Sequence, residues 1–264
     1  MSNLRLFLVI MLKFIIILYL FFRGGIFLLR LHQDFNDLQI INNVIYKSTK
    51  TSFNFKEFYD FVKKMPFDGQ GQVVDKDVEN TLLPPMIRTF YELFFAGYFP
   101  SAKTFLSAYL KSYFNPINKE NIQLKETGVI LNKKGVIARV YRAYPSLVRD
   151  FHFYMLCLES KKFQTIQYSL NNDYKKGVDL TIKYKNVVFS IALLVDTKRG
   201  NSFKNKKYSR HNYKGLHEIC VKINPFDEST RVGKYSLYNE SHLELMIKEM
   251  DLVVHNLSKK TACV

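Results

Sequence analysis

Cysteine, acidic residues and the common nucleophile and phosphate-binding motifs are scarce or absent in this sequence of 264 residues. Its three cysteines, Cys157, Cys220 and Cys263, are odd in number and far apart, which excludes a disulfide framework and a Cys-x-x-Cys zinc site. Neither a Gly-x-Ser-x-Gly motif nor a phosphate-cradling glycine-rich loop is present. This cysteine usage is typical of a reducing compartment, so the expected location is the cytoplasm.

Acidic residues are outnumbered by basic ones. The chain has 23 Asp and Glu against 39 Lys and Arg, which leaves a formal net charge of +16. We expect a chain this basic to meet an anionic partner, with nucleic acid first and an acidic membrane surface second. Hydrophobic residues make up 47% of the sequence, which is enough for a packed core and excludes disorder as the main state.

One long hydrophobic stretch lies near the N-terminus. Residues 6–22 are apolar apart from Lys13. The stretch is shorter than the ~20 residues that usually span a bilayer, and a central lysine costs about 2.5–3.5 kcal/mol on insertion. Two interpretations of residues 1–31 stay open: a weak membrane anchor that tethers the protein, and a segment upstream of the true translation start.

Residues 32–128 are predicted to form a mainly helical region. Apolar side chains recur at helical spacing in residues 53–64, and two more helices are expected over residues 85–97 and 101–114. The last two match either a packed helical hairpin or a DNA-reading helix-turn-helix. We favour the packed hairpin, because any two packed helices give this pattern.

Residues 129–264 are predicted to form an α/β (α+β) domain. A β-hairpin is expected first, over residues 129–131 and 136–141. Ser146 is the expected N-cap of the helix that follows. The remaining segments are a helix, three strands, a basic connector, a strand and a final helix, over residues 147–160, 165–170, 178–184, 187–197, 198–214, 217–223 and 240–256.

Two carboxylates and one lysine lie on neighbouring strands of this domain. Asp179 is expected within the second strand and Asp196 at the end of the third, with Lys198 two residues later. Side chains two apart on a strand point the same way, so Asp196 and Lys198 would share a face that Asp179 can reach. Buried carboxylates need a cation, and hard oxygen ligands suit Mg²⁺, with Mn²⁺ as a substitute.

This arrangement suits metal-dependent hydrolysis of a phosphodiester. The metal would stabilise charge on the phosphate, and Lys198 would position or deprotonate the attacking water. Acid-x-Lys triplets also occur at residues 159–161 and 173–175, but only residues 196–198 end a long apolar strand. The alternative interpretation is that Asp179 and Asp196 are strand-end charges paired with neighbouring Lys and Arg.

Residues 145–223 resemble the PD-(D/E)XK nuclease superfamily, through the segments Gly177-Val178-Asp179-Leu180 and Leu194-Val195-Asp196-Thr197-Lys198. The resemblance implies a restriction-endonuclease-like core of helix, three-stranded meander, helix and strand. It also implies an acid in the second strand and acid-x-Lys in the third. The family often adds an acid from its first helix, and the register favours Asp150 over Glu159, which lies on the opposite side of that helix.

A basic connector follows the third strand. Between residues 139 and 215, sixteen Lys and Arg face five Asp and Glu. We expect the connector to bind nucleic acid rather than lipid, because the excess charge lies in this domain and not beside residues 1–31. The predicted nucleic-acid-binding residues are Lys204, Lys206, Lys207, Arg210 and Lys214.

The sequence therefore predicts a Mg²⁺-dependent DNA endonuclease, and the resemblance implies one of the restriction type or one associated with a mobile element. If each chain has a single active site, cleavage of both DNA strands would favour a homodimer. Two alternatives stay open: a non-catalytic nucleic-acid-binding protein that keeps the nuclease fold, and a membrane-anchored protein whose basic surface meets lipid.

The salt dependence of DNA binding tests the connector. Each phosphate contact changes the slope of log affinity against log salt by about 0.9 on duplex DNA, because it releases condensed counterions. We expect the double variant Lys206→Ala, Lys207→Ala to flatten that slope by roughly 1.8 and to weaken binding to all sequences alike. Parallel lines for variant and wild type in a fluorescence-anisotropy salt series would contradict this expectation.

Overall fold

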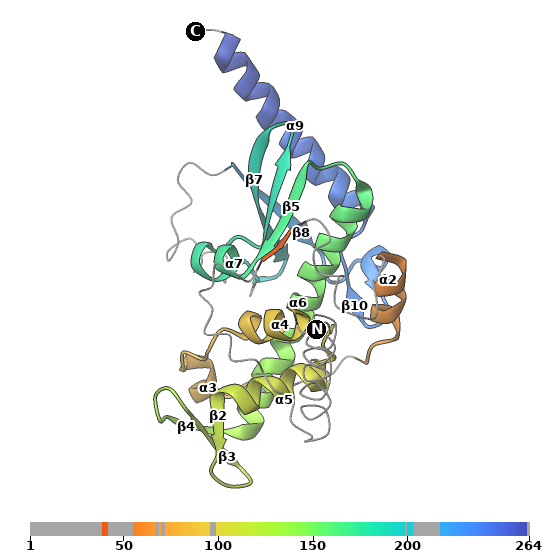
Figure 1. The fold of residues 1–264 in the computed structure, drawn as a ribbon. Coiled ribbons are helices and arrows are strands. Elements are labelled where there is room, and N and C mark those ends of the chain that lie inside the picture. Colours follow the sequence, from red (N-terminus) through yellow and green to blue (C-terminus); the bar gives the residue numbers. More distant parts are fainter. Residues whose placement is uncertain are drawn as a thin grey trace, which may run out of the picture. The chain divides into compact units, whose positions relative to one another are not determined.

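The computed structural model describes residues 39–41, 55–66, 69, 72–95, 99–198, 200–202 and 217–262. All of them belong to one compact unit, Gln33–Val264. These described residues form a mixed α/β fold with a five-stranded sheet, two smaller sheets and several helices (Figure 1). No described helix is both long and apolar enough to cross a membrane. Residues 1–31 lie outside the described part, so both interpretations of that segment stay open.

The main sheet has the strand order β1–β5–β6–β7–β8. The consecutive strands β5, β6 and β7 are antiparallel, and β1 extends the sheet antiparallel to β5. β8 is parallel to β7 and is reached by a crossover connection. The four predicted strands are confirmed, whereas β1 was not expected. The bounds are Gln39–Ile41 for β1, Thr165–Ser169 for β5, Leu180–Tyr184 for β6, Val187–Val195 for β7 and His217–Ile223 for β8.

The β6–β7 hairpin is closed by Lys185-Asn186, the two residues between the predicted strands. Both residues have positive φ, 48° and 66°, which is the conformation of a type I′ turn whose twist matches the flanking strands. In the middle of β7, Phe189, Ser190 and Ile191 are consecutively buried. Both faces of this strand are therefore covered, which is typical of a strand with a long apolar run.

Three helices confirm the predicted helical segments between residues 53 and 114. The Ser101 hydroxyl caps α5 by accepting a hydrogen bond from the Thr104 amide at 3.1 Å. α4 and α5 pack against each other and, with α2 and α3, against α6. The bounds are Phe55–Lys64 for α2, Lys76–Asn80 for α3, Met86–Phe95 for α4, Ala102–Tyr113 for α5 and Lys133–Ser160 for α6.

A three-stranded antiparallel sheet of β2, β3 and β4 connects α5 to α6. Its strands are Phe114–Pro116, Asn121–Leu124 and Ile130–Asn132. The predicted domain boundary between residues 128 and 129 falls in the connection between β3 and β4. The expected hairpin over residues 129–131 and 136–141 is wrong, because β4 pairs with β3 and residues 136–141 lie inside α6.

Burial explains why this segment is helical. Val136, Val140 and Tyr144 are four residues apart and all buried, so they form one stripe along α6. The Asn132 side chain caps the helix by accepting a hydrogen bond from the Gly135 amide at 3.0 Å. The residues expected to form a hairpin turn are therefore the first turn of a helix.

Pro145 lies inside α6 and not before it. A proline at such a position removes one backbone hydrogen bond of the helix. Ser146 is consequently not the N-cap that the sequence predicted, and its hydroxyl donates to the Ala143 carbonyl at 2.7 Å. The predicted end of the helix is confirmed at Ser160, and the following Lys161 is left-handed with φ 54°.

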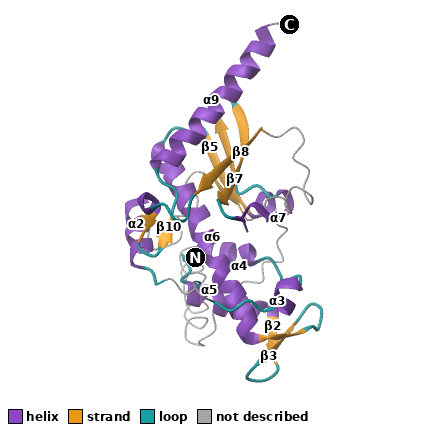
Figure 2. Cartoon of the chain, turned by 180° about the vertical axis from the view of Figure 1, so that it is seen from behind, coloured by secondary structure: helices purple, strands orange, loops and turns teal. Residues whose placement is uncertain are grey.

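Two helices differ from the prediction in the second half of the chain. α7, Leu170–Lys176, lies between β5 and β6, where no helix was expected. α9, Glu240–Ala262, begins at the predicted residue and continues beyond the predicted end; it packs against β8 (Figure 2). A short 3₁₀ helix, Glu228–Thr230, and the strand pair β9 and β10, Arg231–Val232 and Tyr235–Ser236, precede it.

Aromatic side chains join the helices to the main sheet. Phe58 of α2 packs edge-on against Phe151 of α6, with ring centroids 5.1 Å apart. Tyr91 of α4 stacks on Tyr168 of β5 at 4.8 Å. All four rings are buried, and each contributes about 1.5–3 kcal/mol through removal of its apolar surface from water. The N-terminal helices and the sheet therefore share a hydrophobic core.

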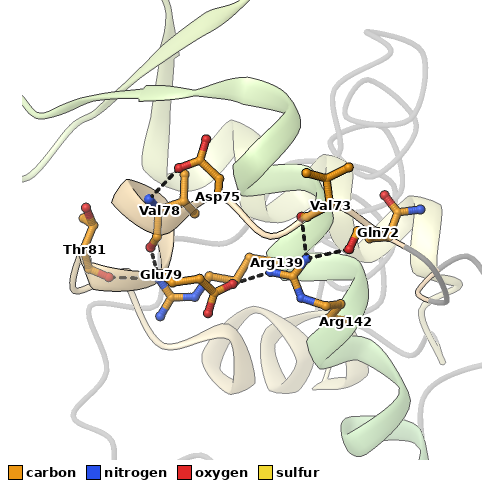
Figure 3. Close-up of polar contacts among 8 residues, drawn as sticks. All are labelled: Gln72, Val73, Asp75, Val78, Glu79, Thr81, Arg139 and Arg142. Carbon is orange, nitrogen blue, oxygen red and sulfur yellow. Dashed lines mark hydrogen bonds and ion pairs between the residues drawn. The ribbon is translucent and has the colours of Figure 1, made fainter.

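Arg139, on the first half of α6, holds the end of α3 (Figure 3). Its Nη1 donates to the carbonyl oxygens of Val78 and Thr81, the latter at 2.9 Å. Carbonyl groups at the C-terminal end of a helix lack partners within that helix, and a cation there also complements the helix dipole. Arg139 therefore attaches α3 to α6.

Arg142, three residues further along α6, holds the segment before α3 (Figure 3). It donates to the Val73 carbonyl at 2.8 Å and forms an ion pair with Glu79. The arginine side chain is 14% exposed and the glutamate side chain 24%, so water screens the pair only weakly. Arg139 and Arg142 are thus both bound within the protein, and the charge of Arg142 is offset by Glu79.

A glycine permits the close approach of α3 and α6. Asp75 caps α3 by accepting a hydrogen bond from the Val78 amide at 3.0 Å. A Cβ atom added at Gly135 would lie 2.7 Å from the Asp75 Cβ, which is closer than real Cβ contacts. The first turn of α6 can therefore carry only glycine at this position without displacing the cap.

Arg142→Ala is expected to destabilise the fold by about 2–4 kcal/mol, because it removes a partly buried ion pair and a carbonyl contact. Urea unfolding followed by circular dichroism measures this loss. Lys134→Ala is the control, since Lys134 is exposed on the same helix and should change stability by less than about 0.5 kcal/mol. Equal, small losses for both variants would show that the Arg142 contacts do not stabilise the fold.

Candidate functional site

Three carboxylates line one cavity of about 270 Å³. Asp150 comes from α6, Asp173 from α7, and Asp179 from the residue before β6. Val195, the last residue of β7, lines the cavity as well. The cavity therefore lies where the helix before the sheet meets the β6–β7 hairpin, and it includes two of the predicted catalytic residues.

Asp179 is the most enclosed of the predicted site residues that the structure describes, with only 4% of its surface exposed. Its carboxylate accepts a hydrogen bond from the Leu193 amide at 2.6 Å, and its own amide donates to the Ile191 carbonyl at 3.1 Å. Both partners belong to β7, so Asp179 is held against the neighbouring strand. It lies one residue before β6, rather than inside the strand as predicted.

Local sequence explains how Asp179 reaches this position. Gly177 ends α7 in the left-handed conformation, with φ 67°, which a residue without Cβ adopts at little cost. Val178 is buried. The chain therefore turns from α7 into β6 within three residues, and the carboxylate of Asp179 is held beside β7.

Asp150 is half-buried on the second half of α6 and lines the cavity. Glu159, the alternative acid on the same helix, is exposed and is not part of the cavity wall. Nine residues separate the two, which places them on opposite sides of a helix. The structure thus brings Asp150, and not Glu159, together with Asp179.

Asp196 and Lys198 are arranged differently from the expectation. β7 ends at Val195, and Lys198 is already helical, so the assumption that Asp196 and Lys198 share one face of a strand is wrong. The Asp196 amide still donates to the Ile223 carbonyl of β8 at 2.8 Å. Both side chains are exposed, and neither lines the cavity.

Thr197 causes this change of direction. Its hydroxyl accepts a hydrogen bond from the Gly200 amide at 3.0 Å, and its carbonyl accepts one from the Asn201 amide at 2.9 Å. This is the hydrogen bonding of an N-cap, which starts a helical turn directly after the strand. A Cβ at Gly200 would clash with the Val195 carbonyl, so a glycine permits this turn to fold back beside the cavity.

Asp173 is a cavity residue that sequence reasoning missed. It belongs to an acid-x-Lys triplet that we set aside because no apolar strand precedes it. The available signal was the pair of helix caps around it: Ser169 accepts a hydrogen bond from the Asn172 amide, and Gly177 ends the helix. Recognition of that short helix would have placed Asp173 near Asp179.

Burial and the three carboxylates keep the nearby tyrosines protonated. Burial raises the pKa of Tyr168 well above its usual value, and the charges of Asp150, Asp173 and Asp179 raise it further. Burial is also the main reason why the pKa of Tyr238, which lines the cavity, is raised. Neither hydroxyl is therefore available as a base near neutral pH.

His152 and Cys157, both on α6, are core residues. Burial lowers the pKa of His152 to about 3, so the ring is neutral at physiological pH, and it packs against the ring of Phe55 with centroids 5.3 Å apart. Burial raises the pKa of the Cys157 thiol, which keeps it protonated and unreactive. Cys157 is thus a free, buried residue of the core.

The donor atoms of the site suit Mg²⁺ in kind. Carboxylate oxygens are the ligands that this ion prefers, and Asp150 and Asp179 bring them to the same cavity. Within the described ranges, however, no group of three or more His, Cys, Asp or Glu side chains is arranged to hold a metal ion. The exposed Asp196 would have to approach Asp150 and Asp179 to complete the predicted set of metal ligands.

The predicted nucleic-acid-binding residues, Lys204, Lys206, Lys207, Arg210 and Lys214, lie outside the described residues. The connector that contains them begins at the helical turn beside Val195 and ends at β8. Their contribution to binding therefore stays a prediction from the sequence. Comparison of the chain with protein-family models, with curated proteins and with solved structures found no match.

Proposed function

We propose that the protein is a metal-dependent endonuclease that hydrolyses DNA phosphodiester bonds. The single observation that carries the proposal is that Asp150 and Asp179 line one cavity, directly beside the end of the strand that precedes Asp196 and Lys198. The net charge of +16 supports an anionic polymer as the substrate. A restriction-type or mobile-element enzyme, acting as a homodimer when both strands are cut, is the proposed niche.

The order of elements supports a restriction-endonuclease-like core. α6 is followed by the antiparallel strands β5, β6 and β7, by a helical turn after β7, and by β8 parallel to β7 (Figure 1). This is the order of helix, meander, helix and strand that the PD-(D/E)XK resemblance implies. α7, inserted between the first two strands of the meander, is an addition to that order.

The residues have distinct roles in the proposed reaction. Asp150, Asp179 and Asp196 would hold Mg²⁺, or Mn²⁺ in its place, and the metal would supply charge stabilisation at the phosphate. The Leu193 amide keeps the Asp179 carboxylate oriented towards the strand end. Lys198 would orient or deprotonate the attacking water, which requires its exposed side chain to turn towards the bound phosphate.

A non-catalytic nucleic-acid-binding protein is the second candidate. The exposure of Asp196 and Lys198, and their separation from the cavity wall, favour it. Such a protein would keep the fold and the salt-dependent binding but would not cleave. Incubation of the full chain with plasmid DNA, in Mg²⁺ or in EDTA, separates the two candidates.

Substitution of each proposed metal ligand tests the catalytic assignment. Asp150→Asn, Asp179→Asn and Asp196→Asn should each reduce Mg²⁺-dependent plasmid cleavage by about 100-fold or more, because metal-assisted charge stabilisation contributes several kcal/mol. DNA binding should be unchanged or stronger, since a negative charge is lost. Glu159→Gln is the matched control on α6, and wild-type cleavage by the three Asn variants would rule the site out.

Lys198→Ala should lose cleavage without loss of folding, because the proposed role of the lysine is chemical. Lys176→Ala removes an equal charge from an exposed lysine at the end of α7 and should cleave as the wild type does. Single-turnover cleavage rates and thermal melting curves measure the two properties. Equal loss of activity in both variants would show that only the general positive charge matters.

A further inference from the structure

β8 is an edge strand of the main sheet. It pairs in parallel with β7, and no other described strand lies along its opposite side. The strand is seven residues long and contains no proline, so its backbone keeps every hydrogen-bond donor and acceptor. A strand edge of this kind is a template for a further strand, and natural proteins usually cover or interrupt it.

The register with β7 shows which backbone groups of β8 face outwards. The Ile223 carbonyl accepts a hydrogen bond from the Asp196 amide at 2.8 Å, so the backbone of Ile223 points towards β7. Backbone direction alternates along a strand, so Glu218, Cys220 and Lys222 direct their amide and carbonyl groups away from β7. The backbone of these three residues is therefore oriented to pair with a strand on the other side.

α9 packs along β8 (Figure 2), and a groove of about 320 Å³ lies between them. Residues 219–222 of β8 all line it. Because side chains alternate between the two faces of a sheet, a groove lined by consecutive residues includes the strand edge. The α9 wall includes Leu245, which is 59% exposed, and Leu252, seven residues further along the same side of the helix, is 65% exposed. Exposed apolar side chains therefore flank the edge of β8.

We infer that the protein forms a homodimer in which the β8 strands of two copies pair antiparallel, with Cys220 at the twofold axis. The inference rests on the proposed function for the expectation of two copies, and it names the surface that joins them. A twofold interface requires a surface that is complementary to itself. The backbone pattern of β8 meets this requirement, because its outward-facing residues, 218, 220 and 222, are symmetric about Cys220.

Opposite charges select this register. An antiparallel pair centred on Cys220 places Glu218 of each copy opposite Lys222 of the other. Opposite charges at facing positions stabilise antiparallel pairing, whereas like charges disfavour it. A centre one residue later, at Val221, would place Lys222 opposite Cys220 and would lose both charge pairs. A second copy therefore fits this edge without any other partner.

The same axis also brings the two α9 helices together. In a continuous antiparallel sheet the twofold axis is perpendicular to the sheet, so both copies of α9 lie on the same face. The exposed Leu245 side chains then lie on that face beside the axis, where each copy can remove apolar surface of the other from water. Backbone pairing and apolar burial thus act at one interface.

Sedimentation velocity of the full chain over a concentration series tests this inference without any cleavage step. The wild type should sediment as a reversible dimer. Cys220→Pro removes an amide hydrogen that does not bond to β7, and it should weaken dimerisation about 10- to 100-fold, because the axis doubles the loss. Cys220→Ala keeps the amide and is the matched control, which should dimerise as the wild type does. Circular dichroism checks folding.

A second variant tests the interface without a proline. Lys222→Glu places two acids opposite each other at both ends of the paired strands and should also weaken the dimer about 10-fold or more. Lys234→Glu is its control, because Lys234 is exposed and does not line the groove, so an equal change of charge there should leave the dimer intact. This pair of variants decides the matter if Cys220→Pro does not fold.

The natural thiol of Cys220 reports the register. Facing residues of an antiparallel pair have Cα atoms about 5.5 Å apart or less, so the thiols of the two copies would lie within reach of a short bis-maleimide. Cys157 is buried, and Cys263→Ser removes the third thiol of the chain. The Cys263→Ser protein should therefore give a covalent dimer, and the further change Cys220→Ser should abolish it.

The outcomes separate this inference from the proposed function. A dimer that is weakened by Cys220→Pro or Lys222→Glu, and that crosslinks through Cys220, supports the interface even if plasmid DNA is not cut and the endonuclease proposal fails. A monomeric wild type overturns the inference, and so does a dimer that neither variant weakens. A dimer without the Cys220 crosslink overturns the register centred on that residue.

Discussion

Helix α6 is the element on which both halves of the described fold depend. Its first half holds residues 72–81 through Arg139 and Arg142, and its second half contributes Arg149 and Asp150 to the cavity. Its buried side packs against α2, α3, α4 and α5, and also against β5. Because a helix keeps its residues at a constant spacing, the position of the cavity residues is tied to the packing of the N-terminal helices.

The cavity brings side chains of opposite charge together. Three carboxylates and one arginine line it, and the arginine forms no ion pair with another described residue. The enclosed Asp179 would be costly as a charged group without compensation, and the short hydrogen bond from the Leu193 amide supplies part of it.

Sequence patterns predicted the elements whose residues interact locally. The β6–β7 hairpin, the strand β8, the helices α4 and α5 and the start of α9 follow from alternation, helical periodicity, caps and a two-residue turn. The first half of α6 and the whole of α7 were missed for two different reasons. Residues 132–135 have the composition of a turn. Because a proline inside a helix is unfavourable, Pro145 made the middle of α6 resemble the start of a separate helix. α7 is short and has a polar sequence, so its capping residues were its main signal.

The sequence by itself determined the charge of the chain, four strands of the main sheet and Asp179 as a candidate, because these depend on composition and on neighbours along the chain; Asp150 became a candidate through the family resemblance. Only the tertiary structure decided that Asp150, Asp173, Asp179 and Arg149 share a cavity and that Asp196 and Lys198 do not. The strand ends at Val195, two residues before the predicted end at residue 197, since Thr197 caps a new helical turn and Gly200 lies against the Val195 carbonyl. Which side chains meet in space depends on such ends and on the packing of α6, and neither is encoded by residue spacing alone.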